Sequence, residues 1–284
     1  MTQDIPSPLP IVEIGGRGPL IHLAVANGFP AQTYRPLLDP LTRDHRVINI
    51  LPRALWPSPP LPDTLNSWAQ MAEDILAGLR QRDLRDVIAV GHSMGGVASM
   101  LAVLAEPERF RALILLDPTF LPPSALRLIW LMRITGQSAR FPLAEGARKR
   151  RAKFADFDDA LAYWTPKPLF RDWPAESLRL YAESMTRPSA DGGLELAWPP
   201  LWEARYYMTV YLSWRREVRR LRGLLPVLAV QGALTDAFTD PSVRIMRRLV
   251  PDATYARVEG FRHLFPQAAP EQTRKIVEPW IRSL

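Results

Sequence analysis

The sequence predicts an α/β fold: a mostly parallel central sheet flanked by helices, with a mainly helical insertion. Short apolar runs alternate with segments of helical periodicity up to residue 116, and this alternation resumes at residue 227. Between them lie helix-like segments, many prolines and six of the nine tryptophans. We therefore expect residues 1–119 and 223–284 to form one catalytic domain, and residues 120–222 to form a helical cap inserted into it.

The predicted strands are short apolar runs that end at turn-forming residues. Gly15-Gly16 and Asn27-Gly28 bound the first two runs, and Pro52 follows the third. Runs that are apolar throughout, rather than alternating, are typical of strands buried on both faces of a parallel sheet. The expected strands are residues 9–14, 20–26, 47–51, 87–90, 112–116, 227–230 and 254–258.

The predicted helices lie between these strands. Asp63 or Thr64 can cap a helix whose apolar residues recur at helical spacing up to Leu79. Further helices are expected at about residues 94–105, after Pro241 and from about Pro270. Strands that alternate with helices form βαβ units, so the sheet should be covered on both faces.

Composition narrows the class of protein. A chain of 284 residues that is 47% hydrophobic can bury a large core. The absence of cysteine excludes disulfides, a cysteine nucleophile and thiolate metal sites. No apolar stretch approaches the length of a membrane span and the first residues do not resemble a leader, so we expect a cytoplasmic protein. The net charge of +7 comes mainly from arginines in helix-like segments without a nucleic-acid motif, which indicates solvated faces and no nucleic-acid partner.

A Gly-x-Ser-x-Gly sequence lies where a predicted strand passes into a predicted helix. Here it reads Gly91-His92-Ser93-Met94-Gly95. A serine on so sharp a turn needs neighbours without a Cβ, because strand and helix approach closely there. The turn would expose Ser93 as a nucleophile and place the Met94 N–H at a helix N-terminus, where it favours an oxyanion.

A serine hydroxyl needs a positioned base, and histidine suits that task near neutral pH. Of the four histidines, His22 lies within a predicted strand and His45 precedes one. The turn should point His92 away from Ser93. This leaves His263, in the loop before the final helix, as the predicted base.

The base in turn needs a carboxylate that fixes its tautomer. Asp117, Asp236 and Asp240 all follow predicted strands. We expect Asp236 to be this acid, because it follows closely on its strand and gives the chain order Ser, Asp, His. Asp240, adjacent to Pro241, is more typical of a helix cap and Asp117 of a turn, but both remain alternatives.

A second oxyanion donor is expected in the turn that follows residue 26. Asn27-Gly28-Phe29-Pro30 can direct the Phe29 N–H toward the same point as the Met94 N–H.

These residues resemble the α/β-hydrolase superfamily, in the branch of serine hydrolases with a helical cap. That branch includes carboxylesterases, lactonases, cofactor-free haloperoxidases and carbon–carbon bond hydrolases. The resemblance implies Ser93 as nucleophile, Asp236 as acid and His263 as base, with Phe29 and Met94 as oxyanion donors. The serine at the elbow argues against the haloalkane dehalogenases and epoxide hydrolases, which have aspartate there.

Two departures from the family pattern affect the geometry of the oxyanion hole and the substrate class. Asn27-Gly28 stands where His-Gly is common, and the loop at residues 52–56 lacks the frequent Arg-Gly-x-Gly-x-Ser sequence.

The predicted reaction is hydrolysis of a small apolar acyl or aryl ester through an acyl-enzyme, with no metal or cofactor. Tryptophans and leucines of the cap would line the substrate pocket, although most of the tryptophans should be core. The rivals that keep the triad are a lactonase, a carbon–carbon hydrolase and a perhydrolase of the haloperoxidase kind. A ligand-binding receptor on the same fold is a further alternative.

Overall fold

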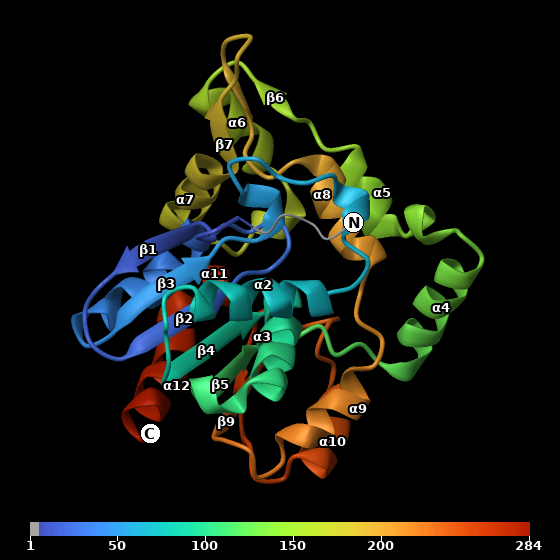
Figure 1. The fold of residues 1–284 in the computed structure, drawn as a ribbon. Helices are drawn as coiled ribbons and strands as arrows, with labels where there is room; N and C mark the ends of the chain where they lie inside the picture. The colour runs from blue at the N-terminus through green and yellow to red at the C-terminus, as the bar shows by residue number, and fades with distance from the viewer. Residues whose placement is uncertain (1–5) are drawn as a thin grey trace.

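The structure, a computed structural model, describes residues 6–284, and within them seven strands form the central sheet (Figure 1). Their order is β1-β3-β2-β4-β5-β9-β10. Only the edge strand β1 pairs antiparallel, which confirms the predicted mostly parallel sheet. The strands are β1 (Ile11–Gly15), β2 (Leu20–Ala24), β3 (Arg46–Ile50), β4 (Val87–His92), β5 (Phe110–Leu116), β9 (Val227–Gly232) and β10 (Thr254–Val258).

Helices cover the sheet on both faces (Figure 1). On one face α2 (Ala69–Arg80) packs on α3 (Met94–Ala105), which contacts β4 and β5. On the other, α12 (Pro270–Arg282) contacts α1 (Arg35–Leu38) and β10. The remaining helices near the end of the chain are α10 (Asp240–Leu249) and α11 (Phe265–Ala268).

The helix α2 begins at Ala69, later than the predicted cap at Asp63 or Thr64. A 3-10 turn occupies Pro62–Thr64 instead, and the Thr64 hydroxyl donates to the Leu61 carbonyl within that turn. From Met71 onward the helix buries its apolar face at the predicted spacing, so the core-facing part of the prediction agrees with the structure.

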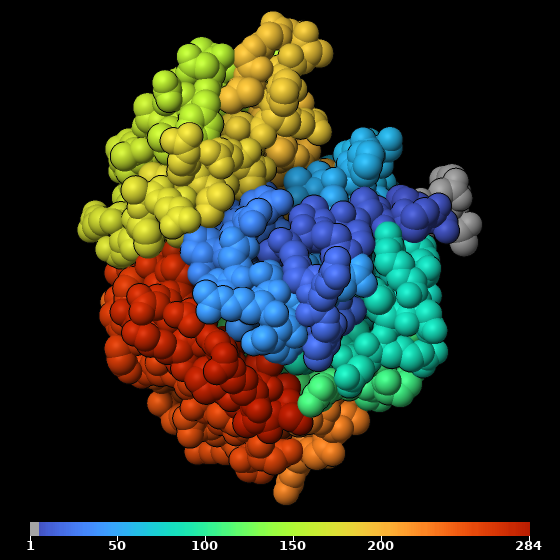
Figure 2. All heavy atoms as spheres, turned by 90° about the vertical axis from the view of Figure 1, so that its left-hand side faces the viewer, coloured from blue at the N-terminus to red at the C-terminus, as the bar shows by residue number. Residues whose placement is uncertain are grey.

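The segment between β5 and β9, called the insertion here, is mainly helical, as predicted. In Figure 1 most of its helices lie above the sheet, and α4 stands at the side. Figure 2 shows part of it, coloured yellow and green, as a lobe seated on one end of the molecule. Its helices are α4 (Pro123–Ile134), α5 (Pro142–Arg148), α6 (Phe157–Trp164), α7 (Ala175–Met185), α8 (Pro200–Met208) and α9 (Trp214–Val218).

The insertion also holds a small antiparallel sheet that the sequence did not predict. Its order is β6-β8-β7, formed by β6 (Lys153–Phe154), β7 (Thr186–Pro188) and β8 (Leu194–Leu196). Strands of two or three residues are too short to display a period of two. A turn in which the Ser189 N–H donates to the Gly193 carbonyl joins β7 to β8.

The insertion shares one hydrophobic core with the sheet. Trp214 stacks on Phe120 with ring centroids 4.6 Å apart, and Phe120 meets Phe238, which lies outside the insertion, edge-on with centroids 5.7 Å apart in the same buried cluster. Trp68, which precedes α2, donates to the Tyr206 carbonyl of α8 at 3.0 Å. The division into a catalytic domain and a cap remains a prediction. Among residues 6–284, no helix combines the length and apolar character needed to cross a bilayer.

Candidate active site

Ser93 lies on a sharp turn between β4 and α3, as the sequence predicts. Its φ of +58° is a left-handed conformation that is costly for a residue with a Cβ. The turn is possible because strand and helix meet at glycines. A Cβ on Gly91 would lie 2.5 Å from the Gly95 carbonyl oxygen, and a Cβ on Gly95 would collide with the Ala24 carbonyl oxygen.

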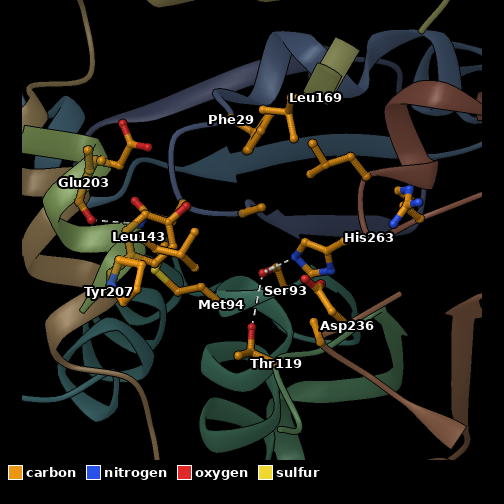
Figure 3. A pocket seen from close by; sticks show the side chains of 18 of the residues that line it. Phe29, Ser93, Met94, Thr119, Leu143, Leu169, Glu203, Tyr207, Asp236 and His263 are labelled. Carbon is orange, nitrogen blue, oxygen red and sulfur yellow. Dashed lines mark hydrogen bonds between the residues drawn. The ribbon is translucent and has the colours of Figure 1, made fainter. Parts of the chain in front are cut away.

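His263 lies within hydrogen-bonding distance of Ser93, so the structure brings together the predicted nucleophile and the predicted base (Figure 3). His263 Nε2 is 2.8 Å from Ser93 Oγ, and Nδ1 is 2.6 Å from Asp117 Oδ2. A carboxylate only accepts, so Nδ1 carries the ring proton and Nε2 accepts the proton of the Ser93 hydroxyl. This arrangement can deprotonate a serine as it attacks a carbonyl carbon.

The carboxylate of Asp117 is fully buried and held by three donors. Besides His263, it accepts from the Gly232 N–H at 2.9 Å and from the Thr235 hydroxyl. These bonds replace the water that the carboxylate loses on burial. Asp117 also has a left-handed backbone, with φ at +42°, so both it and Ser93 lie in strained turns at the ends of adjacent strands.

The choice of Asp236 as the partner of His263 is therefore wrong: the structure places Asp117 there. In the sheet β5 lies between β4 and β9, so the residue after β5 comes nearest to the serine turn. The last residue of β9 and the loop after it, where the acid was expected, each supply one donor to Asp117 instead. Asp236 lines the cavity described below with an exposed side chain (Figure 3). Asp240 begins α10.

The two predicted oxyanion donors differ in their surroundings. Met94 is the first residue of α3, so its N–H has no acceptor within the helix. The N–H groups of a helix point toward its N-terminus, and at this N-terminus Met94 lines the cavity. The Phe29 N–H closes its own turn with a 3.2 Å bond to the Ala26 carbonyl. An oxyanion would have to share or displace this long bond, so a hole with two donors remains a prediction.

His92 points away from Ser93, as expected, but it supports the loop of the base. Its Nε2 lies 3.0 Å from the His263 carbonyl oxygen, and its Nδ1 lies 2.7 Å from the Tyr34 hydroxyl, which also accepts from the Ala26 N–H at 3.0 Å. Burial holds the pKa of His92 well below its usual value. The neutral ring therefore donates through Nε2 and links the serine turn, the His263 loop and the end of the strand before Phe29.

Thr119 also lies beside the nucleophile, which the sequence did not predict. Its hydroxyl oxygen lies 3.2 Å from Ser93 Oγ (Figure 3). The signal available in the sequence was its place three residues past a strand that ends beside the serine turn.

A cavity of about 690 Å³ opens above Ser93, between the carboxyl ends of the strands and the insertion. Apolar side chains make up most of its wall. Five of the six tryptophans of the insertion are buried in the core, as expected for most of them, and two of these five, Trp164 and Trp173, also line the cavity; Trp130 is exposed. Further lining residues include Phe29, Met94, Leu128, Ile129, Leu143, Leu169 and Tyr207.

A buried ion pair interrupts this apolar wall. Arg150, just after α5, pairs with Glu203 of α8, and its other terminal nitrogen donates to the Tyr181 hydroxyl at 2.7 Å. Burial raises the pKa of Glu203, and Arg150 opposes that shift. The pair adds no net charge to the cavity. Among residues 6–284, no group of three or more acidic or histidine side chains is placed to hold a metal ion.

Comparisons with known proteins agree with this architecture. A RutD protein from Azorhizobium caulinodans, named provisionally as a carbamate hydrolase, is 25% identical over 91% of this chain and 89% of its own length. A 2-(acetamidomethylene)succinate hydrolase from Mesorhizobium japonicum is 26% identical over 78% of this chain and 73% of its own.

A solved structure of an E-2-(acetamidomethylene)succinate hydrolase superposes with a TM-score of 0.80 at 24% identity, covering 96% of this chain and 94% of that one. The family model described as alpha/beta hydrolase fold matches residues 22–266. The chain therefore belongs to the alpha/beta hydrolase fold family.

Proposed function

We propose that the chain is a serine hydrolase that cleaves a small ester-type substrate through an acyl-enzyme formed on Ser93. The observation that carries this proposal is the continuous run of hydrogen bonds from Asp117 through His263 to Ser93, which ends at the floor of the cavity. Each bond has the direction that the chemistry requires: the carboxylate accepts from the imidazole, and the imidazole accepts from the hydroxyl.

In the acylation step, Ser93 Oγ attacks the carbonyl carbon while its proton passes to His263 Nε2. Asp117 stabilises the imidazolium that results. The Met94 N–H, with the Phe29 N–H if it is released from its turn, would stabilise the oxyanion. The imidazolium then protonates the leaving alkoxide or phenoxide, and a water activated by His263 hydrolyses the acyl-enzyme. All these groups belong to the chain itself, so we predict no metal or cofactor.

The size and lining of the cavity favour a substrate with an apolar acyl or aryl group, which would bind there. It lies within the usual volume range for small-molecule sites, and its wall is mostly aromatic and aliphatic. Of the charged side chains that line it, Arg150 and Glu203 neutralise each other, which favours a substrate that carries no net charge at that wall.

A second candidate is cleavage of an amide or carbamate carbon–nitrogen bond by the same acyl transfer. It is favoured by two relatives, one provisionally named a carbamate hydrolase and the other named a 2-(acetamidomethylene)succinate hydrolase. The same triad serves both reactions, because only the leaving group that His263 protonates differs.

The experiment is hydrolysis of p-nitrophenyl esters from acetate to decanoate by the unaltered protein and by Ser93→Ala. We expect turnover with an optimum at a chain length that the cavity accommodates, and a loss of at least about 10³-fold in the variant. Matched p-nitroanilides and carbamates test the second candidate. Turnover only of lactones, vinylogous diketones or peracid-forming mixtures would replace the ester proposal with one of its rivals. Tight binding without repeated turnover would indicate a receptor.

A further inference from the structure

The hydroxyl of Thr119 donates a hydrogen bond to Ser93 Oγ, as the positions of the protons on Ser93 and His263 require. Ser93 has a single hydroxyl proton, which goes to His263 Nε2 because Nδ1 already carries the ring proton for Asp117. In the hydrogen bond of 3.2 Å between Ser93 Oγ and Thr119 Oγ1, the donor is therefore Thr119. Within residues 6–284 the Thr119 hydroxyl has no other hydrogen-bond partner, so nothing else competes for its proton.

The backbone holds Thr119 in this position. Asp117, Pro118 and Thr119 follow β5 directly, and the Thr119 N–H donates to the Ser93 carbonyl at 3.2 Å. Two residues earlier, the side chain of Asp117 bonds to the base. One short segment thus orients His263 from one side and Ser93 from the other. Thr119 also lines the cavity, so its hydroxyl is at the reacting atoms (Figure 3).

We infer that Thr119 is a further catalytic residue, whose hydroxyl stabilises Ser93 Oγ when this oxygen leaves the acyl group during deacylation. The inference rests on the proposed acyl-enzyme. In that step water adds to the acyl carbon and gives a proton to His263 Nε2. The bond between the carbon and Oγ then breaks, its electron pair goes to Oγ, and Oγ takes the proton back from His263. Thr119 keeps its own proton throughout.

The hydrogen bond from Thr119 acts differently in the two half-reactions. In deacylation, negative charge builds on Oγ as the carbon–oxygen bond breaks, and a hydrogen bond to a charged oxygen is stronger than one to a neutral oxygen. In acylation, the hydroxyl oxygen of Ser93 already accepts this bond before the reaction, whereas in the acyl-enzyme Oγ is an ester oxygen and a weaker acceptor, so the bond gains less strength on the way to the transition state of acylation. Removing the hydroxyl should therefore slow deacylation selectively.

The test compares Thr119→Val, which keeps the shape without the hydroxyl, with Thr119→Ser, which keeps the hydroxyl. Rapid mixing with p-nitrophenyl acetate separates the burst of p-nitrophenol, which reports acylation, from steady turnover. We expect Thr119→Val to lower the deacylation rate about 10- to 100-fold. In this variant kcat and KM should fall together, and kcat/KM should stay within about threefold of the unaltered protein. The amplitude of the p-nitrophenol burst should equal the enzyme concentration. Thr119→Ser should recover most of the lost rate.

Several outcomes would overturn the inference. These are an unchanged deacylation rate in Thr119→Val, equal losses in acylation and deacylation, or a serine variant as impaired as the valine variant. The melting temperature and the rate of phosphonate labelling at Ser93 control for folding in each variant. If the unaltered protein turns over no ester, amide or carbamate, both the proposed function and this inference fail. If it turns over and Thr119→Val behaves like it, only the inference fails.

Discussion

Replacing Asp117 by asparagine tests which carboxylate supports the base. The carboxylate accepts from His263, Gly232 and Thr235 at once, and both of its oxygens are used. An asparagine offers one acceptor oxygen and one NH2 group, so at least one of these donors would face another donor. If the amide oxygen turns toward Gly232, its NH2 favours the His263 tautomer that can no longer accept from Ser93.

The expected loss follows from that tautomer. A comparable change in a serine protease triad costs about 10⁴ in kcat. At about 1.4 kcal/mol for each factor of ten, this corresponds to about 5.5 kcal/mol in the barrier. The carboxylate of Asp117 accepts three hydrogen bonds, one of them from His263, as the acid of such a triad does. We therefore expect Asp117→Asn to lower kcat by about 10³- to 10⁴-fold.

Asp236→Asn is the matched control, since Asp236 lines the same cavity with an exposed side chain. We expect its kcat to stay within about threefold of the unaltered protein. The assay is steady-state hydrolysis of the best p-nitrophenyl ester, with melting temperatures to show that both variants are folded. A loss of about 10³-fold or more in Asp236→Asn, with Asp117→Asn nearly active, would instead identify Asp236 as the carboxylate that supports His263.

Three further predictions concern the support of the site. Tyr34→Phe removes the hydroxyl that donates to His92 and accepts from the Ala26 N–H. We expect the free energy of unfolding, measured in urea, to fall by about 1–3 kcal/mol and kcat to fall as well. Unchanged stability and kcat would show that these hydrogen bonds do not support the site. Gly95→Ala places a methyl group against the Ala24 carbonyl and should abolish activity, whereas Gly146→Ala, where a Cβ meets nothing within 4 Å, should leave activity and melting temperature nearly unaltered. Burial lowers the pKa of His22 to about 3 and holds that of His92 well below its usual value, so the unfolded chain binds protons that the folded chain does not. The contribution of these two histidines to the free energy of unfolding should be fully present above a pH of about 6.5. Below that pH, each of the two should lower the free energy of unfolding by about 1.4 kcal/mol per pH unit. Urea titrations between about pH 7 and pH 5 measure this slope, and a flat profile would contradict the prediction.

Much of the fold could be predicted because its signals are local. The runs at residues 112–116 and 227–230 lie within β5 and β9, and the helix at residues 94–105 matches α3, since each of these segments is apolar and buried. The serine turn is likewise marked by glycines that the close approach of β4 and α3 requires. The strands of the insertion have no such pattern, because they are only two or three residues long.

The acid of the site could not be chosen from local signals. Asp117 and Asp236 both follow a strand and both give the chain order Ser, Asp, His. What separates them is the order of the strands, with β5 beside β4, and the donors that Gly232 and Thr235 direct at Asp117. His92 and Thr119 were missed for the same reason, since their contacts join segments far apart in the chain or at the ends of different strands.

The most direct test of the account is to trap the covalent intermediate. The protein is reacted with a fluorophosphonate, and its intact mass and peptide masses are compared with those of Ser93→Ala treated in the same way. We expect one adduct per chain, located on Ser93, with labelling slowed strongly in Asp117→Asn. An unlabelled protein, or an adduct on another residue that persists in Ser93→Ala, would contradict it.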